Sequence, residues 1–325
     1  AVFLLVSFIT PYLAPKQFSS LSLLSLVVSP LIVLNLLFAL YWLVGLKKQF
    51  LLSTLILVAA YFFFNPFYKF SSSTDLNTSH NTISVLSYNV RLFNAYQKTI
   101  DATEISKVLD KTLQKTNPDV IFIQEYYRKT KQKFPDYPYQ YIHFKNEKIG
   151  LGYAVFSKYP LINTGSFDFK KSYNNSLYAD LIKGKDTIRL YNVHLKSLGL
   201  APSVNYLQLQ DKEKLVKRTE ARFGRQQEQV MVLLSHMKDS KYPIILAGDF
   251  NNTAFSYVYR KLQQNMKDAF VEKGSGLGTT FLFNLYPMRI DYIFGSQELE
   301  VLKFTSLEQT FSDHYPIAAV FAIPK

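Results

Sequence analysis

Carboxylates and arginines are missing from the first seventy residues, and this absence constrains the fold more than any other feature of the sequence. The only charged side chains there are Lys16, Lys47, Lys48 and Lys69. Two apolar runs in this stretch, Leu21–Leu46 and Phe50–Phe70, are each long enough to cross the roughly 30 Å hydrocarbon core of a bilayer. We therefore expect residues 1–70 to form two full transmembrane helices plus a partial one at Ala1–Leu13, followed by a polar linker at residues 71–82.

Basic and aromatic residues indicate how such helices would be oriented. Tyr41, Trp42 and Tyr68 suit the membrane–water interfaces. Lys47 and Lys48 link the two runs, so the positive-inside tendency places this link in the cytoplasm and everything after Phe70 outside. Pro30 is expected to kink the first run or to mark its true start. Because the chain does not begin with Met, we expect it to be a fragment or a trimmed chain.

Two other interpretations of the N-terminal segment fit less well. A buried helical hairpin of a soluble protein would rarely contain two such runs without a carboxylate. A cleaved signal peptide would be a single run followed by small residues at a cleavage site, which the sequence lacks.

The rest of the chain is basic and has no cysteine. Four of the 37 basic residues lie in the first seventy, which leaves 33 basic against 24 acidic residues and a net charge of +9. This surplus favours an anionic partner such as nucleic acid, a lipid headgroup or a phosphorylated metabolite, although a basic surface also serves solubility. The absence of cysteine excludes a thiol nucleophile, a disulfide scaffold and a thiolate metal site.

Short apolar or β-branched segments bounded by turn residues predict a β-rich fold after residue 82. The expected strands are Ile83–Val90, Val120–Gln124, Tyr153–Ser157, Leu177–Ile182, Ile188–His194, Ile244–Gly248, Arg289–Phe294 and Ile317–Ile323. Apolar residues at helical spacing predict helices at Ala102–Lys115 and Glu220–Met237. Many strands with few helices indicate an α+β sandwich, in which two sheets face each other and helices lie outside.

Polar clusters follow five of these strands. They are Ser87–Arg91, Phe122–Glu125, Tyr191–Leu195, Ala247–Asn252, and the pair Arg289–Ile293 with Ser312–Pro316. Each cluster alone has an ordinary structural explanation. Gly248-Asp249 could form a turn, Glu125 could be a solvated loop carboxylate, and His194 could be a core histidine. Five such clusters, each at the end of a strand, are much harder to explain in this way.

Together the clusters contain the groups that phosphoester hydrolysis needs. Glu125 and Asn89, with a carboxylate from Asp249 or Asp313, supply the oxygen ligands that a hard divalent cation prefers. His314 can take a proton from water, and Asp291 can hold its ring. Asn251, Asn192 and His194 can donate hydrogen bonds to phosphoryl oxygens. Tetrahedral zinc is disfavoured, and no serine-hydrolase or Walker-type motif is present.

These clusters, in this order, resemble those of the endonuclease/exonuclease/phosphatase superfamily over about residues 83–323. The resemblance implies a four-layer α/β sandwich, preceded here by the N-terminal helices, and Mg²⁺- or Mn²⁺-dependent hydrolysis of a phosphoester. It implies that Asn89 and Glu125 bind the metal, that Asp249 and Asn251 orient water and phosphate, and that Asp291 pairs with His314. Asp313 resembles a further metal-site carboxylate, and His194 resembles a second histidine that acts as general acid or phosphate ligand. The number of metals, and the choice of Asp249 or His314 as base, stay open.

Some branches of the superfamily fit less well than others. Arg91 stands where apurinic endonucleases carry an Asp, and Arg289–Ile293 lacks the aromatic signature of inositol 5-phosphatases. Gly152–Pro160 and the helix with Arg222, Arg225 and Gln226 resemble membrane-anchored bacterial members. We therefore expect an integral protein of the bacterial inner membrane whose catalytic domain, residues 83–325, is extracytoplasmic.

Three functions are compatible with these features. The leading one is a membrane-tethered metal-dependent phosphodiesterase or phosphatase, and tethering to the lipid bilayer favours a lipid headgroup as substrate. The alternative is a nuclease acting on external DNA or RNA, which the basic charge would suit. A catalytically silent phosphate-binding scaffold is the third, and the presence of Glu125, Asp249, Asp291 and His314 argues against it.

Overall fold

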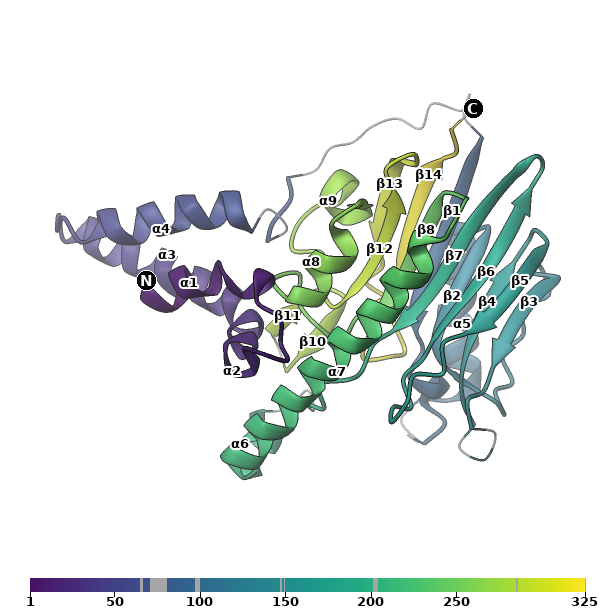
Figure 1. Cartoon of the computed structure of the whole chain (residues 1–325), viewed down its shortest axis with the longest axis horizontal. Helices are drawn as coiled ribbons and strands as arrows, with labels where there is room; N and C mark the ends of the chain where they lie inside the picture. The colour runs from purple at the N-terminus through teal and green to yellow at the C-terminus, as the bar shows by residue number, and fades with distance from the viewer. Residues whose placement is uncertain are drawn as a thin grey trace.

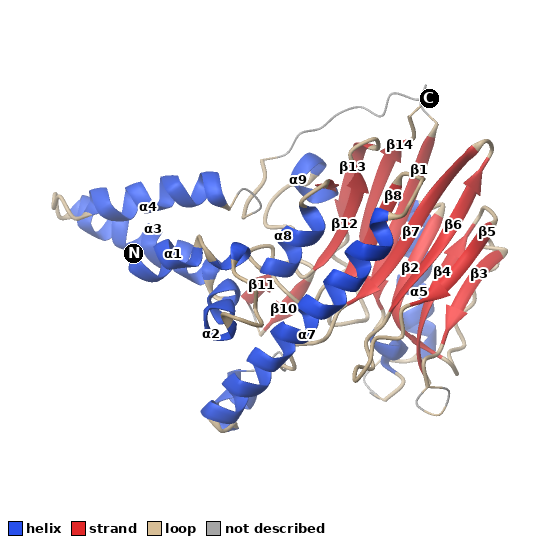
Figure 2. Cartoon of the chain, viewed as in Figure 1, coloured by secondary structure: helices blue, strands red, loops and turns tan. Residues whose placement is uncertain are grey.

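The computed structural model describes residues 1–64, 67–70, 81–96, 100–146, 148, 150–200, 204–284 and 286–324. Two six-stranded sheets face each other after residue 81 (Figures 1 and 2). The first sheet has the order β13 (Glu300–Ser306), β14 (Ile317–Ala322), β1 (Thr82–Asn89), β2 (Val120–Tyr127), β4 (Leu151–Ser157), β3 (Tyr139–His143). The second has the order β5 (Leu161–Ser166), β6 (Ser176–Lys183), β7 (Asp186–His194), β8 (Ile244–Asp249), β12 (Asp291–Ser296), β9 (Met266–Asp268).

Both sheets are mixed, because β1 and β2 are parallel, as are β7 and β8, while the other neighbours are antiparallel. The inner faces of the two sheets share one apolar core, in which Val85 and Phe122 of the first sheet meet Leu190 and Ile245 of the second. Strands buried on both faces carry continuous apolar runs, and Ile244–Ala247 is an example.

Helices cover the outer faces of both sheets. On the first sheet, α5 (Ala102–Thr116) buries Ile105 and Leu109. On the second, α7 (Lys212–Lys238) and α8 (Tyr257–Gln263) form a common core with β7, β8 and β12. Asp101 caps α5 by accepting a hydrogen bond from the Glu104 amide, and Asp211 caps α7 in the same way. The prediction of two facing sheets with outer helices is confirmed.

All eight predicted strands and both predicted helices are present, and four strands that were not predicted share one property. Among the described strands, β3, β13, β5 and β9 lie at the edges of the two sheets. An edge strand is half-exposed and carries polar residues, so it lacks the apolar run that marks an interior strand. The hairpin of β10 (Phe281–Phe283) and β11 (Tyr286–Met288) and the helices α6 (Val204–Leu209) and α9 (Ala269–Lys273) were also not predicted.

The N-terminal segment differs from the prediction of two continuous spans. It forms α1 (Val2–Ser7), η1 (Thr10–Tyr12), α2 (Ser19–Ser22), η2 (Leu23–Leu26), α3 (Val28–Val44) and α4 (Phe50–Phe63). The predicted helix Leu21–Leu46 is broken at Val27, and its two parts are bent by 61°. Pro30 explains the break, because its ring would clash with the carbonyl of Leu26 and it has no N–H to donate.

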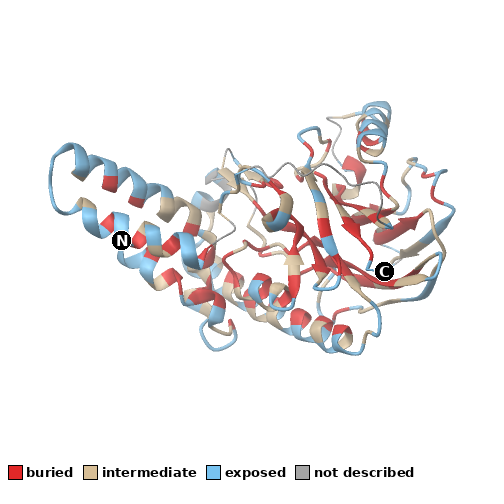
Figure 3. Cartoon of the chain, turned by 90° about the horizontal axis from the view of Figure 1, so that it is seen from above, coloured by how far each residue is buried: buried red, intermediate tan, exposed pale blue. Residues whose placement is uncertain are grey.

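No single helix in the described part of the chain is long and apolar enough to cross a membrane. The bent pair Ser19–Leu26 and Val28–Val44 satisfies the length and composition requirement only when the two parts are taken together. Residues 71–80 of the predicted linker lie outside the described residues. The α3–α4 hairpin extends away from the sandwich, and much of its surface is exposed (Figure 3).

The bent part of the N-terminal segment is attached to the sandwich by specific contacts. The backbone amide of Lys16 donates to Gln227 Oε1 at 2.9 Å, and its ammonium group lies 2.7 Å from Glu228. Thr253 Oγ1 donates to the Ser25 carbonyl at 2.8 Å. Phe64 packs edge-on against Phe255 with 5.0 Å between ring centroids. The break in the helix therefore lies against the catalytic domain.

Gly248 allows the two central strands of the second sheet to approach each other, and its replacement tests this packing. Its φ is +145°, and a Cβ there would lie 1.8 Å from the Val193 carbonyl oxygen. We expect Gly248→Ala to lower the free energy of unfolding by about 3 kcal/mol or more. Gly184→Ala is the matched control, since Gly184 also has a positive φ but nothing within 4 Å of the added methyl group. It should cost only about 1 kcal/mol in the same urea titration, and equal losses would contradict this account.

Candidate active site

Strand topology brings the five polar clusters to one edge of the sandwich. The carboxyl ends of the parallel strands β1 and β2 carry Asn89 and Glu125. On the facing sheet, β7 and β8 are also parallel, and His194 pairs with Asp249 in their register. β12 runs antiparallel to β8, which places Asp291 opposite Asp249. The sequence clusters, spread over more than two hundred positions, therefore meet in space.

A β-bulge in β2 turns Glu125 toward this edge. The register between β2 and β4 shifts between Ile123 and Tyr126, and Glu125 has a φ of 55°. Gln124, just before it, is fully buried between the sheets and donates to Ser87 and Asn192. Bulges re-aim side chains in this way and are common beside active sites.

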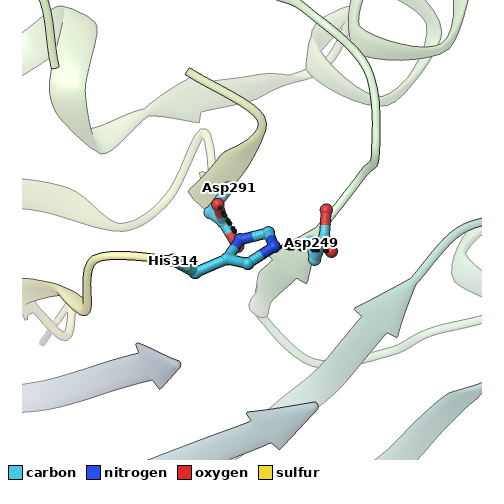
Figure 4. A group of neighbouring side chains, drawn as sticks. All are labelled: Asp249, Asp291 and His314. Carbon is cyan, nitrogen blue, oxygen red and sulfur yellow. Dashed lines mark hydrogen bonds and ion pairs between the residues drawn. The ribbon is translucent and has the colours of Figure 1, made fainter. Parts of the chain in front are cut away.

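His314 lies between two carboxylates (Figure 4). Its Nδ1 is 2.9 Å from Asp291 Oδ2, and its Nε2 is 3.7 Å from Asp249 Oδ2. All three side chains are buried. Burial alone lowers the pKa of the His314 imidazole, but Asp291 and Asp249 outweigh burial and raise this pKa above its usual value. The group can therefore hold a proton at Nε2, on the side that faces the pocket.

Asp249 is held by hydrogen bonds from both sides of the site. Its Oδ2 accepts from Asn89 Nδ2 at 3.0 Å and from Asn251 Nδ2 at 3.1 Å, and its Oδ1 accepts from the Asn251 amide at 2.7 Å. Burial raises the pKa of Asp249, and the neighbouring His314 partly offsets this shift. Asp249 and His314 thus form a buried pair that can share a proton.

The position predicted for a metal is formed by Glu125, Asn89 and Asp313. Burial raises the pKa of the Glu125 carboxyl, His314 lowers it, and Asp313 raises it. The Asn89 side chain also lowers the pKa of Glu125, and Arg91 Nε lies 3.4 Å from Asp313 Oδ2. Two neighbouring half-buried carboxylates leave room for more positive charge than Arg91 supplies. The residues fit a hard divalent cation, since carboxylate and amide oxygens are its preferred ligands.

A second group of possible ligands consists of Asp249, Asp291 and His314, whose ligand atoms all lie within 4.8 Å of one another. His314 Nδ1 already bonds Asp291, and binding a metal at this nitrogen would break that bond. We therefore interpret this group as the proton-transfer group and the Glu125 group as the metal position.

His194 lies in the site, but its environment disfavours one of its predicted roles. Its Nε2 is 2.7 Å from Asn174 Nδ2 and 3.4 Å from Asp249 Oδ2. Burial, with smaller contributions from His314 and Lys196, lowers its pKa to about 3. A neutral imidazole can hydrogen-bond a phosphoryl oxygen, whereas a general acid would need a pKa nearer to neutrality.

The structure does not bring Asn192 into the pocket, which differs from its prediction as a substrate ligand. Its Nδ2 donates to the carbonyls of Ile123 and Ala154, both at 2.9 Å, and its Oδ1 accepts from Gln124. The side chain is fully buried and ties the facing sheets together. Asn192 therefore has a structural role, and of the two predicted substrate ligands only Asn251 lines the pocket.

The pocket around these side chains has a volume of about 580 Å³. Every predicted site residue except Asn192 and Asp291 lines it, and Arg91 lines it as well. The sequence analysis missed Asn174, which positions His194, and the apolar side of the pocket. That side includes Leu26, Val27 and Pro30, three residues of the N-terminal segment. The proline in the first apolar run was the only sequence signal for this contribution.

The fold and the site define a metal-dependent phosphoester hydrolase. The sequence model of the Endonuclease/Exonuclease/phosphatase family matches residues 86–314, and the chain belongs to this family. Its members are metal-dependent phosphoester hydrolases, which include nucleases, phosphodiesterases and phosphatases. A second family model, a domain of unknown function (DUF8431), matches residues 1–67. No curated protein matches the chain.

Solved structures of the same fold come from bacteria and animals. An endonuclease/exonuclease/phosphatase from Bacteroides vulgatus is 17% identical with a TM-score of 0.58, covering 74% of this chain and 99% of that one. D. rerio TDP2, solved with a single-strand DNA product, is 18% identical with a TM-score of 0.55, covering 74% and 99%. The human Nocturnin catalytic domain, solved with a bound sulfate anion, is 17% identical with a TM-score of 0.54, covering 74% and 94%. At these identities the likeness establishes the fold alone.

Replacement of Asn192 tests its structural role. Asn192→Ala leaves two backbone carbonyls and Gln124 without partners in the core. We expect a loss of about 2–4 kcal/mol in the free energy of unfolding, measured by urea titration. If the variant kept its stability but bound substrate more weakly, Asn192 would be a substrate ligand after all.

Replacement of His194 tests its neutral state. Its pKa is 6.5 in the unfolded chain and about 3 in the folded one, so between these pH values only the unfolded chain binds a proton. Unfolding is therefore favoured as the pH falls from about 6.5 toward 3. In His194→Asn the free energy of unfolding should fall less steeply with falling pH than in the wild type. The difference between the two slopes should be about 1.4 kcal/mol per pH unit. Urea titrations with chelator at several pH values measure this slope, and parallel curves for both proteins would contradict the assignment.

Proposed function

We propose that this chain is a membrane-tethered, Mg²⁺-dependent phosphodiesterase or phosphatase whose substrate carries a lipid-like group. The observation that carries the proposal is the pocket itself, where a buried His–Asp pair faces a metal position on one side and apolar residues on the other. A metal-dependent hydrolase needs the first two features. The apolar side suits a substrate that is only partly polar.

The proposed mechanism assigns a task to each side chain of the site. Glu125 and Asn89, with Asp313 nearby, would hold Mg²⁺, which would supply positive charge to neutralise the phosphoryl oxygens. Water bonded to Asp249 and His314 attacks phosphorus, the P–O bond to the leaving group breaks, and the proton of water passes to the Asp249–His314 pair. Asp291 keeps the imidazole oriented and stabilises its charged form.

Hydrogen bonds position the phosphoryl group in this mechanism. Asn251 Nδ2 lies 3.1 Å from both the Leu195 carbonyl and Asp249 Oδ2, so its amide is fixed beside the attacking water. His194, neutral because of its low pKa, can donate a hydrogen bond from its one ring N–H to a phosphoryl oxygen.

The membrane tether is supported by the surface of the N-terminal helices. Large apolar side chains on α3 and α4 are exposed over several turns, for example Leu37 at 56%, Leu55 at 68% and Phe62 at 76%. Apolar patches of this kind are typical of surfaces that lie in lipid or against another protein. We propose insertion of the α3–α4 hairpin into the bacterial inner membrane, with the catalytic domain outside the cytoplasm. If this domain were protected from protease in intact spheroplasts, the catalytic domain would lie in the cytoplasm and the orientation would be the opposite of the one proposed.

A nuclease is the second candidate, and the net charge of +9 after residue 70 favours it. D. rerio TDP2, which shares the fold, was solved with a single-strand DNA product. Hydrolysis of phospholipid vesicles against plasmid DNA, each with Mg²⁺ and with chelator, separates the two candidates. We expect vesicle hydrolysis that chelator abolishes, and cleavage of DNA alone would favour the nuclease.

Replacement of His314 tests the proposed chemistry. Because His314 holds the proton that water loses, His314→Ala should lower kcat by about 10²–10⁴-fold. The matched control is His143→Ala, since His143 on β3 bonds Asp168 outside the pocket. The control should hydrolyse a small phosphodiester such as bis(p-nitrophenyl) phosphate at the wild-type rate. An unchanged rate in His314→Ala, with its fold confirmed by circular dichroism, would reject the assigned role.

A further inference from the structure

The catalytic pocket changes from polar to apolar along its length. At one end lie Glu125, Asp249 and His314. Phe281, whose ring centroid lies 5.0 Å from that of His314, begins the apolar wall, and Phe283, Ile290 and residues at the break in the N-terminal helix continue it. A phosphate bound at the polar end would therefore have an apolar surface next to it.

A second cavity, of about 530 Å³, adjoins the apolar end of the first. The two cavities share Pro30, Tyr286 and Met288 as lining residues. Beyond these, α3 contributes Val33 and Leu34, and the catalytic domain contributes Phe255 and Leu277. Apolar lining residues thus connect the catalytic side chains to α3, the helix that forms the exposed hairpin with α4.

One charged residue, Arg289, is found among the described residues that line the second cavity. Its Nη1 lies 2.6 Å from Asp268 Oδ2, and its guanidinium rests on the rings of Phe270 and Tyr292 at 4.5 and 4.7 Å from their centroids. Its charge is therefore already compensated within the protein, and the cavity does not call for an anionic occupant.

The N-terminal wall of these cavities is fixed in position. The Ser25 carbonyl accepts a hydrogen bond from Thr253, and Ser29 on α3 lines the second cavity together with Tyr286. Phe64, at the end of α4, packs against Phe255. These contacts hold the helix break, and with it Pro30, against the β10–β11 hairpin. The N-terminal segment is thus part of the active site as well as an attachment to it.

We infer that the two cavities bind the hydrocarbon chain of an amphiphilic phosphoester, with its phosphate at the His314 end and its chain along α3. The inference rests on the proposed phosphoesterase activity and extends it, because it assigns a separate binding site for the hydrocarbon chain of the substrate. A polynucleotide would fit poorly, since its sugars and phosphates would lose water in an apolar cavity without gaining hydrogen bonds. A hydrocarbon chain gains free energy from the same burial.

A homologous series of p-nitrophenyl alkyl phosphates tests the inference on the full chain in nanodiscs with Mg²⁺. All members have the same reacting group, and only the alkyl chain lengthens from ethyl to octyl. Each methylene group that enters the cavities raises kcat/KM by up to about fourfold. We therefore expect the octyl ester to exceed the ethyl ester by at least about 100-fold in kcat/KM.

Two tryptophan substitutions on α3 distinguish binding in the cavity from partition into the lipid. Val33 lines the second cavity and Leu37 lines neither cavity, although both are exposed, at 46% and 56%. Val33→Trp should fill the cavity and lower the octyl-to-ethyl ratio at least about tenfold. Leu37→Trp should keep the wild-type ratio. Leu277→Trp fills the same cavity from the catalytic domain and should act as Val33→Trp does, which guards against a local folding defect on α3.

The outcomes separate this inference from the proposed function. Hydrolysis of the ethyl ester with the same octyl-to-ethyl ratio in all variants would overturn the inference and leave the phosphoesterase standing. Equal losses in Val33→Trp and Leu37→Trp would also overturn it, because they would show a general effect of α3 on lipid contact. Failure of the wild type to hydrolyse any ester would overturn the proposed function and the inference together.

Discussion

Asp249 is a carboxylate with 1% of its surface exposed, and the arrangement of the active site depends on how its charge is compensated. Two amides, one backbone N–H and two imidazoles surround it. These donors come from β1, β7, β8 and the segment before β14, so compensation requires both sheets to be in register. The residues that stabilise the buried charge are therefore the same ones to which we assign phosphate binding and proton transfer. The buried Asp249 carboxylate therefore also determines how the two sheets pack against each other at this edge.

The N-terminal segment has two physical roles in this account. Its helices α3 and α4 expose large apolar side chains, which we propose lie in a membrane, while its bent part is held to the catalytic domain by polar contacts and aromatic packing. The break at Val27 connects these roles, since it places a proline-containing turn beside the catalytic pocket. A straight helix from Leu21 to Leu46 could not form this wall. The two family matches, at residues 1–67 and 86–314, meet at a site to which both contribute.

The sequence predicts the interior of the fold and the polar groups of the site well, because both leave local signals. Strands buried on both faces have apolar runs, and their polar ends mark the edge where ligands bind. Edge strands such as β3 and β13 have no such signal. Asn192 and His194 show the limit of this reasoning, since both point to the same face of β7. The two residues are about 7 Å apart along the strand. At this distance Asn192 is a buried contact between the sheets, whereas His194 lines the pocket. Only the packed structure distinguishes them.

The central claim is that the metal binds at Glu125 and leaves the His314–Asp291 pair intact. Crystals of the full chain soaked with Mn²⁺, measured for its anomalous scattering, test this claim most directly. We predict an anomalous peak within coordination distance of the Glu125 carboxylate, with His314 Nδ1 still bonded to Asp291. A peak bound to His314 and Asp291, with none beside Glu125, would contradict the account.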